Sequence, residues 1–129
     1  MAKPFDITGI HHHSVIATDA DAARHFYGNQ LGLQELASPS SFKFPVIWYA
    51  CGDEQLHLMI KEGIDTISPR HVALHIRDAK AARSNLQAKG IKIDETVRIP
   101  GADRFFVRDP DGNRIELIEW SIPWGEGAM

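Results

Sequence analysis

Apolar and polar positions along the first third of the chain predict one strand followed by one helix. Residues 8–18 contain β-branched side chains and no proline, which favours a strand. Asp19 then offers a side-chain oxygen to cap a helix, and Gly32 can adopt the left-handed conformation that ends one. Between them, apolar side chains recur at helical spacing, at Ala23, Phe26, Tyr27 and Leu31. We expect this helix to pack its apolar face on a sheet.

The rest of the first half favours extended structure. A short segment from Leu33 to Leu36 and a loop rich in serine and proline precede two predicted strands. These strands run from Val46 to Ala50 and from Leu56 to Ile60. Gly52-Asp53-Glu54 separates them and is a plausible hairpin turn.

The second half repeats this order of elements. Residues 70–78 read as a strand that ends in a second capping aspartate, Asp78. A helix lined by Ala79, Ala82 and Leu86 follows and is closed by Gly90. After Ile91 to Ile93 and a loop, strands are predicted at residues 105–107 and 114–120, with the turn Asp109-Pro110-Asp111-Gly112-Asn113 between them.

Three pairs of polar landmarks share one spacing of 59 positions, which predicts an internal repeat. They are His12 and His71, Asp19 and Asp78, and His57 and Glu116. The two glycines that end the helices, Gly32 and Gly90, are 58 positions apart. The second half is therefore one residue shorter up to the end of its helix, and a later loop restores the spacing of 59.

Strand alternation places four of these landmarks on faces turned away from the helices. Successive side chains of a strand point to opposite faces, so His71 lies opposite the apolar side chains of its strand, and His12, His57 and Glu116 follow the same rule. If the two halves curve toward each other about a pseudo-twofold axis, these side chains converge. Three imidazoles and a carboxylate suit a divalent transition ion: zinc, nickel, cobalt, manganese or iron. The other histidines, His11, His13, His25 and His75, lack this support.

Composition narrows the function classes. The 129 residues, 43% of them hydrophobic, are enough for one domain with a core. The formal charge is −3, whereas nucleic-acid binding requires a basic surface. No run of apolar residues is close to the length needed to span a membrane. Cys51 is the single cysteine, so a metal site must use nitrogen and oxygen donors. We expect a cytoplasmic protein that binds neither nucleic acid nor membrane.

Several motifs together resemble the vicinal oxygen chelate superfamily, the group that contains glyoxalase I, bleomycin- and fosfomycin-resistance proteins and extradiol dioxygenases. The resemblance runs from about Ile7 to Trp120. It rests on the segment from Ile10 to Asp19, on Phe26-Tyr27 with Leu31-Gly32-Leu33, on residues 70–74, and above all on residues 106–118. It implies an α+β fold in which two tandem βαβββ modules, residues 7–62 and 68–122, form one domain with a cupped mixed β-sheet around a metal site.

The resemblance also assigns site residues. It places the metal ligands at His12, His71 and Glu116, with His57 at the end of the first module. Glyoxalase-like members carry glutamate or glutamine at that fourth position, and this departure argues against activity on methylglyoxal and glutathione. Glu116 and His57 are the candidate catalytic residues, and His57 is open to either role, ligand or base.

Three function classes follow from the resemblance. The first is a glyoxalase-like lyase or isomerase that polarises a small oxygen-chelating substrate and transfers a proton. The second is a fosfomycin-type thiol transferase, and the third is a metal-free binding protein of the bleomycin-sequestering kind. An extradiol dioxygenase fits less well, because many of those chains carry four modules.

The remaining candidates concern the pocket and the assembly. Phe44, Trp48, Arg104 and Arg108 could line a substrate pocket, with the arginines meeting an anionic group. We expect a homodimer, because modules in this family often pair between chains. The sequence leaves open whether one chain or two complete the metal site.

Overall fold

The computed structural model describes residues 10–63 and 70–121, and its first half has the predicted order of elements. The elements are β1 (His12–Ala17), α1 (Ala20–Ala23), the π-helix η1 (Arg24–Gln30), β2 (Gln34–Leu36), β3 (Val46–Cys51) and β4 (Glu54–Ile60). They form a four-stranded sheet in the order β1-β4-β3-β2. Within it β1 and β4 are parallel, and the other neighbours are antiparallel.

The second half repeats this sheet. Its elements are β5 (His71–His75), α2 (Ala79–Ala88), β6 (Asp94–Glu95), β7 (Ala102–Arg108) and β8 (Arg114–Trp120). They form a second four-stranded sheet in the order β5-β8-β7-β6. The predicted α+β chain of two βαβββ modules is confirmed. The predicted module limits at residues 7, 68 and 122 lie outside the described residues.

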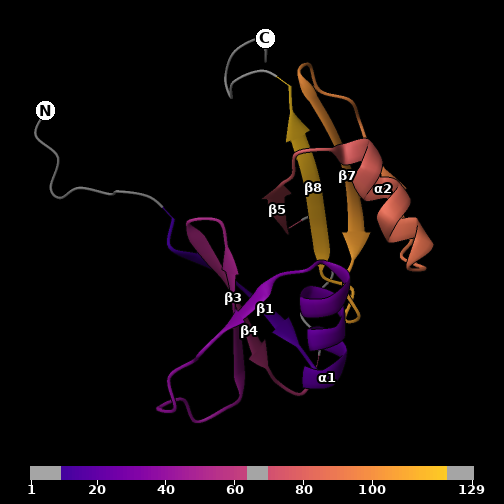
Figure 1. The fold of residues 1–129 in the computed structure, drawn as a ribbon. Helices are drawn as coiled ribbons and strands as arrows, with labels where there is room; N and C mark the ends of the chain where they lie inside the picture. The colour runs from indigo at the N-terminus through magenta and orange to yellow at the C-terminus, as the bar shows by residue number, and fades with distance from the viewer. Residues whose placement is uncertain (1–9, 64–69, 122–129) are drawn as a thin grey trace, which may run out of the picture.

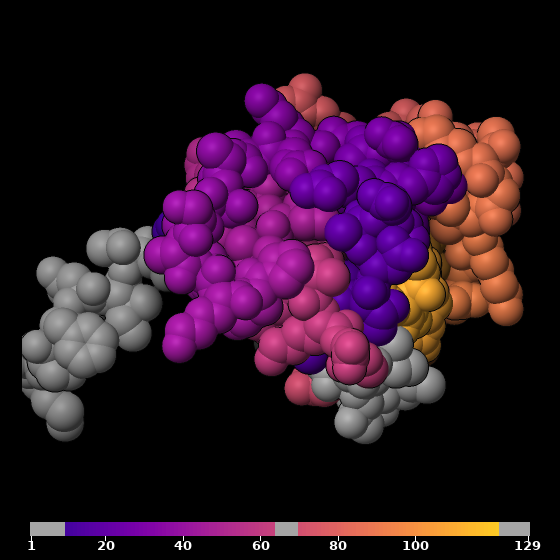
Figure 2. Space-filling view, turned by 90° about the horizontal axis from the view of Figure 1, so that it is seen from below, coloured from indigo at the N-terminus to yellow at the C-terminus, as the bar shows by residue number. Residues whose placement is uncertain are grey.

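The two modules lie against each other with their helices on one side of the molecule. α1 and α2 lie near each other on that side, next to the sheets of their own modules (Figure 1). From below, the first half (indigo to magenta) and the second half (orange and yellow) form one continuous body (Figure 2). Among the described residues, their buried apolar side chains other than Phe106 and Ile118 belong to a single core cluster. β1 and β5, the strands of His12 and His71, are edge strands of the two sheets.

The predicted helix signals are confirmed. The Asp19 carboxylate accepts hydrogen bonds from the backbone N–H groups of Asp21 (2.9 Å) and Ala22 (3.1 Å). Asp78 caps α2 in the same way. Gly32 ends the first helical segment at φ 79°, a conformation that side chains with a Cβ rarely adopt. The capping aspartates therefore set where both helices begin, and Gly32 sets where the first one ends.

The first helix differs from the regular α-helix that the spacing predicts. After the single turn of α1, residues 24–30 form a π-helix, and the Leu31 N–H donates to the Phe26 carbonyl at 2.8 Å. A π-helical turn contains more residues than an α-helical one, so it accommodates an insertion. It also leaves two consecutive side chains, Phe26 and Tyr27, buried in the core.

This π-helix explains the one-residue gap in the repeat. Asp19 and Gly32 are 13 positions apart, whereas the equivalent Asp78 and Gly90 are 12 apart. The second half has a compensating extra residue in the hairpin between β7 and β8. There, Val107 pairs with the residue eight positions later, while Tyr49 in the first half pairs with the residue seven positions later.

Tyr27 connects the modules through a buried hydrogen bond. Its hydroxyl donates to the Asp109 carboxylate at 2.6 Å. The same carboxylate accepts from the backbone of Asp111 and from both the backbone and side chain of Asn113. The Asn113 amide also donates to the Ile16 carbonyl at 2.8 Å, so the turn between β7 and β8 is attached to β1. Burial and the Asp109 charge raise the pKa of Tyr27 well above its usual range, so its hydroxyl stays a donor.

Among residues 10–63 and 70–121, no helix is long and apolar enough to cross a membrane.

Removal of the Tyr27 hydroxyl should destabilise the protein. In Tyr27→Phe the buried Asp109 carboxylate loses a donor, and we expect the free energy of unfolding to fall by about 1–3 kcal/mol. Chemical denaturation measures this difference. Tyr49→Phe is the matched control, because the buried Tyr49 hydroxyl has no hydrogen-bond partner in the described part of the chain. Its removal should leave stability unchanged or raise it. Equal losses in the two variants would contradict this role for Tyr27.

Candidate metal centre

The first pair of predicted donors lies on the helix-free face of the first sheet. His12 opposes Gln55 and His57 opposes Ser14 in the parallel pairing of β1 with β4, so the two histidines are diagonal neighbours. Their rings stack with centroids 4.0 Å apart and an interplanar angle of 16°. The Trp48 indole, from the strand on the other side, stacks on His57 at 4.0 Å and 2°. His57 is therefore the middle ring of a stack of three.

His57 is held with one nitrogen available. Its side chain is buried, and its Nε2 lies 2.8 Å from the Gln55 amide oxygen. A carbonyl oxygen only accepts, so Nε2 carries the proton and Nδ1 keeps the lone pair. Burial, and then the nearby His12 and His11, lower the pKa of His57. The neutral imidazole that a metal requires is thus favoured.

The second pair of predicted donors occupies the equivalent place on the second sheet. His71 Nε2 lies 2.9 Å from Glu116 Oε1. Two ligands bound to one ion at about 2.1 Å and at right angles lie about 3 Å apart, so this separation suits a shared ion. The other Glu116 oxygen lies 3.4 Å from Arg104 Nη1. Only 7% of the carboxylate side chain is exposed, and these two contacts compensate for its burial.

The two pairs do not join within one chain. Across residues 10–63 and 70–121, no group of three or more histidine, cysteine, aspartate or glutamate side chains is close enough to hold a metal ion. The convergence of all four donors that the repeat predicts is therefore absent from a single chain. Each module carries one pair of the predicted donors, on equivalent strands and faces.

The pocket candidates lie in different places. Trp48 belongs to the ring stack, and Phe44 contacts it through Phe42, whose ring lies 5.9 Å from Phe44 and 6.0 Å from Trp48. Arg104 lies beside Glu116. Arg108 instead donates to the Gly112 carbonyl at 3.0 Å, which supports the turn between β7 and β8.

Sequence reasoning missed four neighbours of the donors. His11 Nδ1 lies 2.9 Å from His12 Nδ1, and Gln55 contacts His57 as described above. In the second sheet the Phe106 ring lies 5.1 Å from His71, edge to face, and Arg114 stacks on Phe106 at 3.6 Å. Gln55 and Arg114 each precede a predicted donor by two positions on its strand, so strand alternation alone could have identified them.

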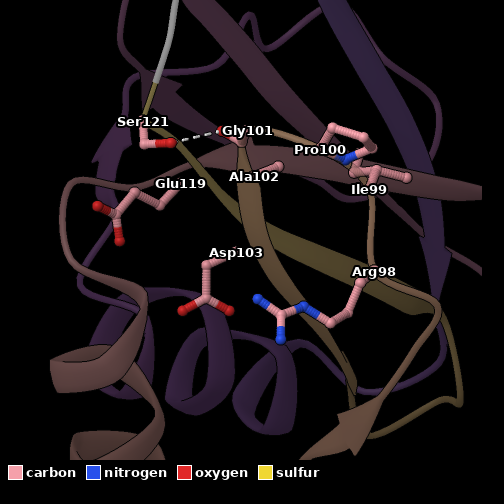
Figure 3. A pocket seen from close by; sticks show the side chains of 8 residues that line it. All are labelled: Arg98, Ile99, Pro100, Gly101, Ala102, Asp103, Glu119 and Ser121. Carbon is pink, nitrogen blue, oxygen red and sulfur yellow. Dashed lines mark hydrogen bonds between the residues drawn. The ribbon is translucent and has the colours of Figure 1, made fainter. Parts of the chain in front are cut away.

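A separate cavity of about 560 Å³ opens near the end of β8. Asp103, Glu119 and Arg98 are among its lining residues, and the Ser121 hydroxyl donates to the Gly101 carbonyl at its rim (Figure 3). None of the predicted site residues lines it. Glu119 also accepts a hydrogen bond from the Ala79 N–H at the start of α2, on the helix side of the sheet.

The sheet order and the repeat define an α+β protein of two βαβββ modules. The chain belongs to the Glyoxalase/Bleomycin resistance protein/Dioxygenase superfamily, whose model matches residues 9–117. The family predicted from the sequence is thereby confirmed. A search of curated protein sequences finds no match.

Solved structures support the same assignment. A glyoxalase family protein from Bacillus anthracis is 30% identical, with a TM-score of 0.84 over 92% of this chain and 99% of that one. TnmS3, an antibiotic binding protein from Streptomyces, is 26% identical, with a TM-score of 0.74 over 91% and 99%. The fosfomycin resistance protein FosX from Listeria monocytogenes, solved with Mn(II) and 1S,2S-dihydroxypropylphosphonic acid, shares the fold at 16% identity, with a TM-score of 0.79 over 91% and 95%.

The ring stack should be visible in tryptophan fluorescence. A protonated imidazole in contact with an indole quenches its emission, so emission of chelator-treated protein should fall as His57 binds a proton. Because the pKa of His57 is lowered, the midpoint should lie below 6.5, the ordinary value for histidine. Trp48→Phe should remove the pH-dependent part of the signal. Quenching that persists in this variant would contradict the assignment.

Proposed function

We propose that this protein is a divalent-metal-dependent enzyme of the glyoxalase type that acts on a small oxygen-chelating substrate by proton transfer. One observation carries the proposal. The His12–His57 pair and the His71–Glu116 pair lie on equivalent strands and on the helix-free faces of the two sheets. A duplicated fold maintained only for stability has no need of donors at both positions.

The donor chemistry fits a transition ion. Three imidazoles and one carboxylate supply nitrogen and oxygen ligands, which suits zinc, nickel, cobalt, manganese or iron better than calcium or magnesium. His12, His57, His71 and Glu116 would hold the ion. When bound, such an ion polarises two adjacent oxygens of the substrate as a Lewis acid.

Glu116 and His57 are the side chains that can move a proton. They occupy equivalent positions in the two halves, and both are buried. His71 and Arg104 orient the Glu116 carboxylate through its two oxygens. Gln55 and the stacked rings of His12 and Trp48 restrict the His57 imidazole. Groups held in this way transfer a proton without first reorganising.

We further propose that two chains share each site. Each chain presents two half sites, and no complete donor group forms within residues 10–63 and 70–121. His12 and His71 lie on β1 and β5, which are edge strands and so are accessible to a second copy. A twofold dimer that joins the first sheet of one copy to the second sheet of the other completes two identical sites.

Metal content tests the donor set. Protein purified without chelator should carry about one transition ion per chain. His12→Ala and His71→Ala should lose it on dialysis, because each removes one nitrogen ligand. His75→Ala is the matched control: it removes an exposed histidine from the same strand as His71, and it should keep the ion. Absence of metal from the native protein would refute the proposal that it is a metal-dependent enzyme.

Mixing two defective chains tests whether the site is shared. A double variant His12→Ala/His57→Ala lacks the first half site, and His71→Ala/Glu116→Ala lacks the second. Neither alone should bind metal. After they are unfolded and refolded together in equal amounts, half of the dimers contain one chain of each kind and one intact site, so about one ion per four chains should return. No recovery would show that a site forms within one chain.

Turnover tests the role of Glu116. The substrate panel comprises methylglyoxal hemithioacetal, fosfomycin with thiol, and catechol, and turnover of any member should require metal. Glu116→Gln should lower kcat by about 10²-fold or more, because the amide cannot accept a proton. His75→Ala should remain active. An unchanged kcat in Glu116→Gln would exclude this residue as the base.

A second candidate function is metal-free binding of a small molecule. It is favoured by the exposed aromatic rings of Phe42 and Phe44 beside Trp48, a surface on which a planar ligand could stack. The likeness to an antibiotic binding protein from Streptomyces supports it as well. A binding protein of this kind should retain its ligand in His12→Ala, whereas the metal-dependent enzyme should lose turnover.

A further inference from the structure

A cluster of cationic side chains surrounds Phe106 next to the His71–Glu116 pair. Phe106 opposes Glu116 in the pairing of β7 with β8, and only 3% of the residue is exposed. The Arg114 guanidinium lies 3.6 Å from the centroid of its ring and the Arg104 guanidinium 5.8 Å. His71 contacts the same ring edge to face. One buried ring thus places two guanidinium groups beside a predicted metal ligand.

Arg114 has hydrogen-bonding capacity to spare. A guanidinium carries five N–H donors, all in its own plane. Stacking on Phe106 uses the face of the group, so the donors at its rim stay available. No hydrogen bond or ion pair to Arg114 is found among the described residues. Its nitrogen atoms are not buried, because the Tyr49 hydroxyl is the one buried side-chain polar atom without a partner among the described residues. An acceptor group of a ligand can therefore reach the guanidinium.

Arg104 is fixed in position by the protein itself. Its Nε and Nη2 donate to the Val97 carbonyl at 3.2 and 2.9 Å. Its Nη1 lies 3.4 Å from Glu116, at the long end of a hydrogen bond. Only 18% of its side chain is exposed. This arginine is held rigidly, with its charge directed toward the site.

The balance of charge on this face is positive. Arg104 contacts the Glu116 carboxylate, and Arg114 opposes Arg108 at the end of the same hairpin. The neighbouring Asp94 opposes Phe106 on β6 and has Lys92 as a counter-ion at 3.8 Å. A divalent ion bound by three neutral imidazoles and one carboxylate would add further positive charge. A neutral substrate would leave this excess uncompensated, whereas an anionic one would neutralise it.

We propose that Arg114 and Arg104 form an anion subsite, and that the substrate is therefore a small molecule with a carboxylate, phosphonate or phosphate group next to its chelating oxygens. This inference rests on the proposed function for its place beside the metal. Arg114 supplies a flat pair of donors that fits two oxygens of the anion. Arg104 supplies charge at a fixed point between the anion and Glu116.

Binding of simple anions tests the subsite. Calorimetry measures the Kd of methylphosphonate, inorganic phosphate and acetate for the metal-loaded and the chelator-treated full chain. Acetamide serves as the neutral analogue, and comparison of the three anions shows which acid group is preferred. Arg114→Gln should weaken binding of the preferred anion about tenfold or more. Lys80→Gln is the matched control, because it removes an exposed positive charge from α2, away from the Phe106 cluster. It should change the Kd less than twofold.

The other outcomes of these measurements distinguish failure of the anion subsite from failure of the proposed function. Equal effects of Arg114→Gln and Lys80→Gln would overturn the subsite, as would no anion binding at all or equal binding of acetamide. Anion binding that needs the metal but is unaffected by Arg114→Gln would overturn it too, because the anion then binds the ion alone. Metal content measured on the same samples should match the native protein in both variants. Metal absent from the native chain, with anion binding still dependent on Arg114, would refute the proposed function and leave the subsite supported.

Discussion

Each sheet of this protein has one face packed toward the helices and the core. Its polar side chains must therefore lie on the opposite face. Leu56 and Leu58 point into the core, so His57 between them cannot, and Ile115 and Leu117 place Glu116 in the same way. A shift of one residue in strand register would turn these donors into the core. The hydrophobic core therefore determines the positions of the candidate chemistry as strictly as it determines the fold.

The two proposed half sites differ in what surrounds the predicted donors. In the first sheet His57 lies between two aromatic rings, and its neighbours are nitrogen groups and an amide. In the second sheet Glu116 lies between His71 and Arg104, and the guanidinium groups of Arg104 and Arg114 lie over the Phe106 ring. Gln55 and Arg114 stand at the same place in the two halves, so one repeat position has a neutral side chain in one module and a charged one in the other. A site built from both would have an aromatic wall and a basic wall.

Much of the fold was predictable from the sequence, because capping aspartates, helix-ending glycines and strand alternation act locally. The donor faces followed from the same alternation. The π-helix was not predictable, since its apolar spacing resembles that of an α-helix until the Leu31 hydrogen bond is known. The separation of the two donor pairs depends on how the modules pack, through contacts such as that between Asn113 and Ile16, and no local pattern encodes it. Arg114 was missed because an arginine in a strand usually faces solvent.

The two places where the halves differ in length touch each other. The extra residue of the first helix lies in the segment that carries Tyr27, and the extra residue of the second hairpin lies in the turn that carries Asp109. These two residues form the 2.6 Å hydrogen bond that joins the modules. A chain with only one of these insertions would have a buried polar group without its partner. The duplicated halves are therefore no longer equivalent, because a second copy of either module in place of its twin would lack one partner of this hydrogen bond.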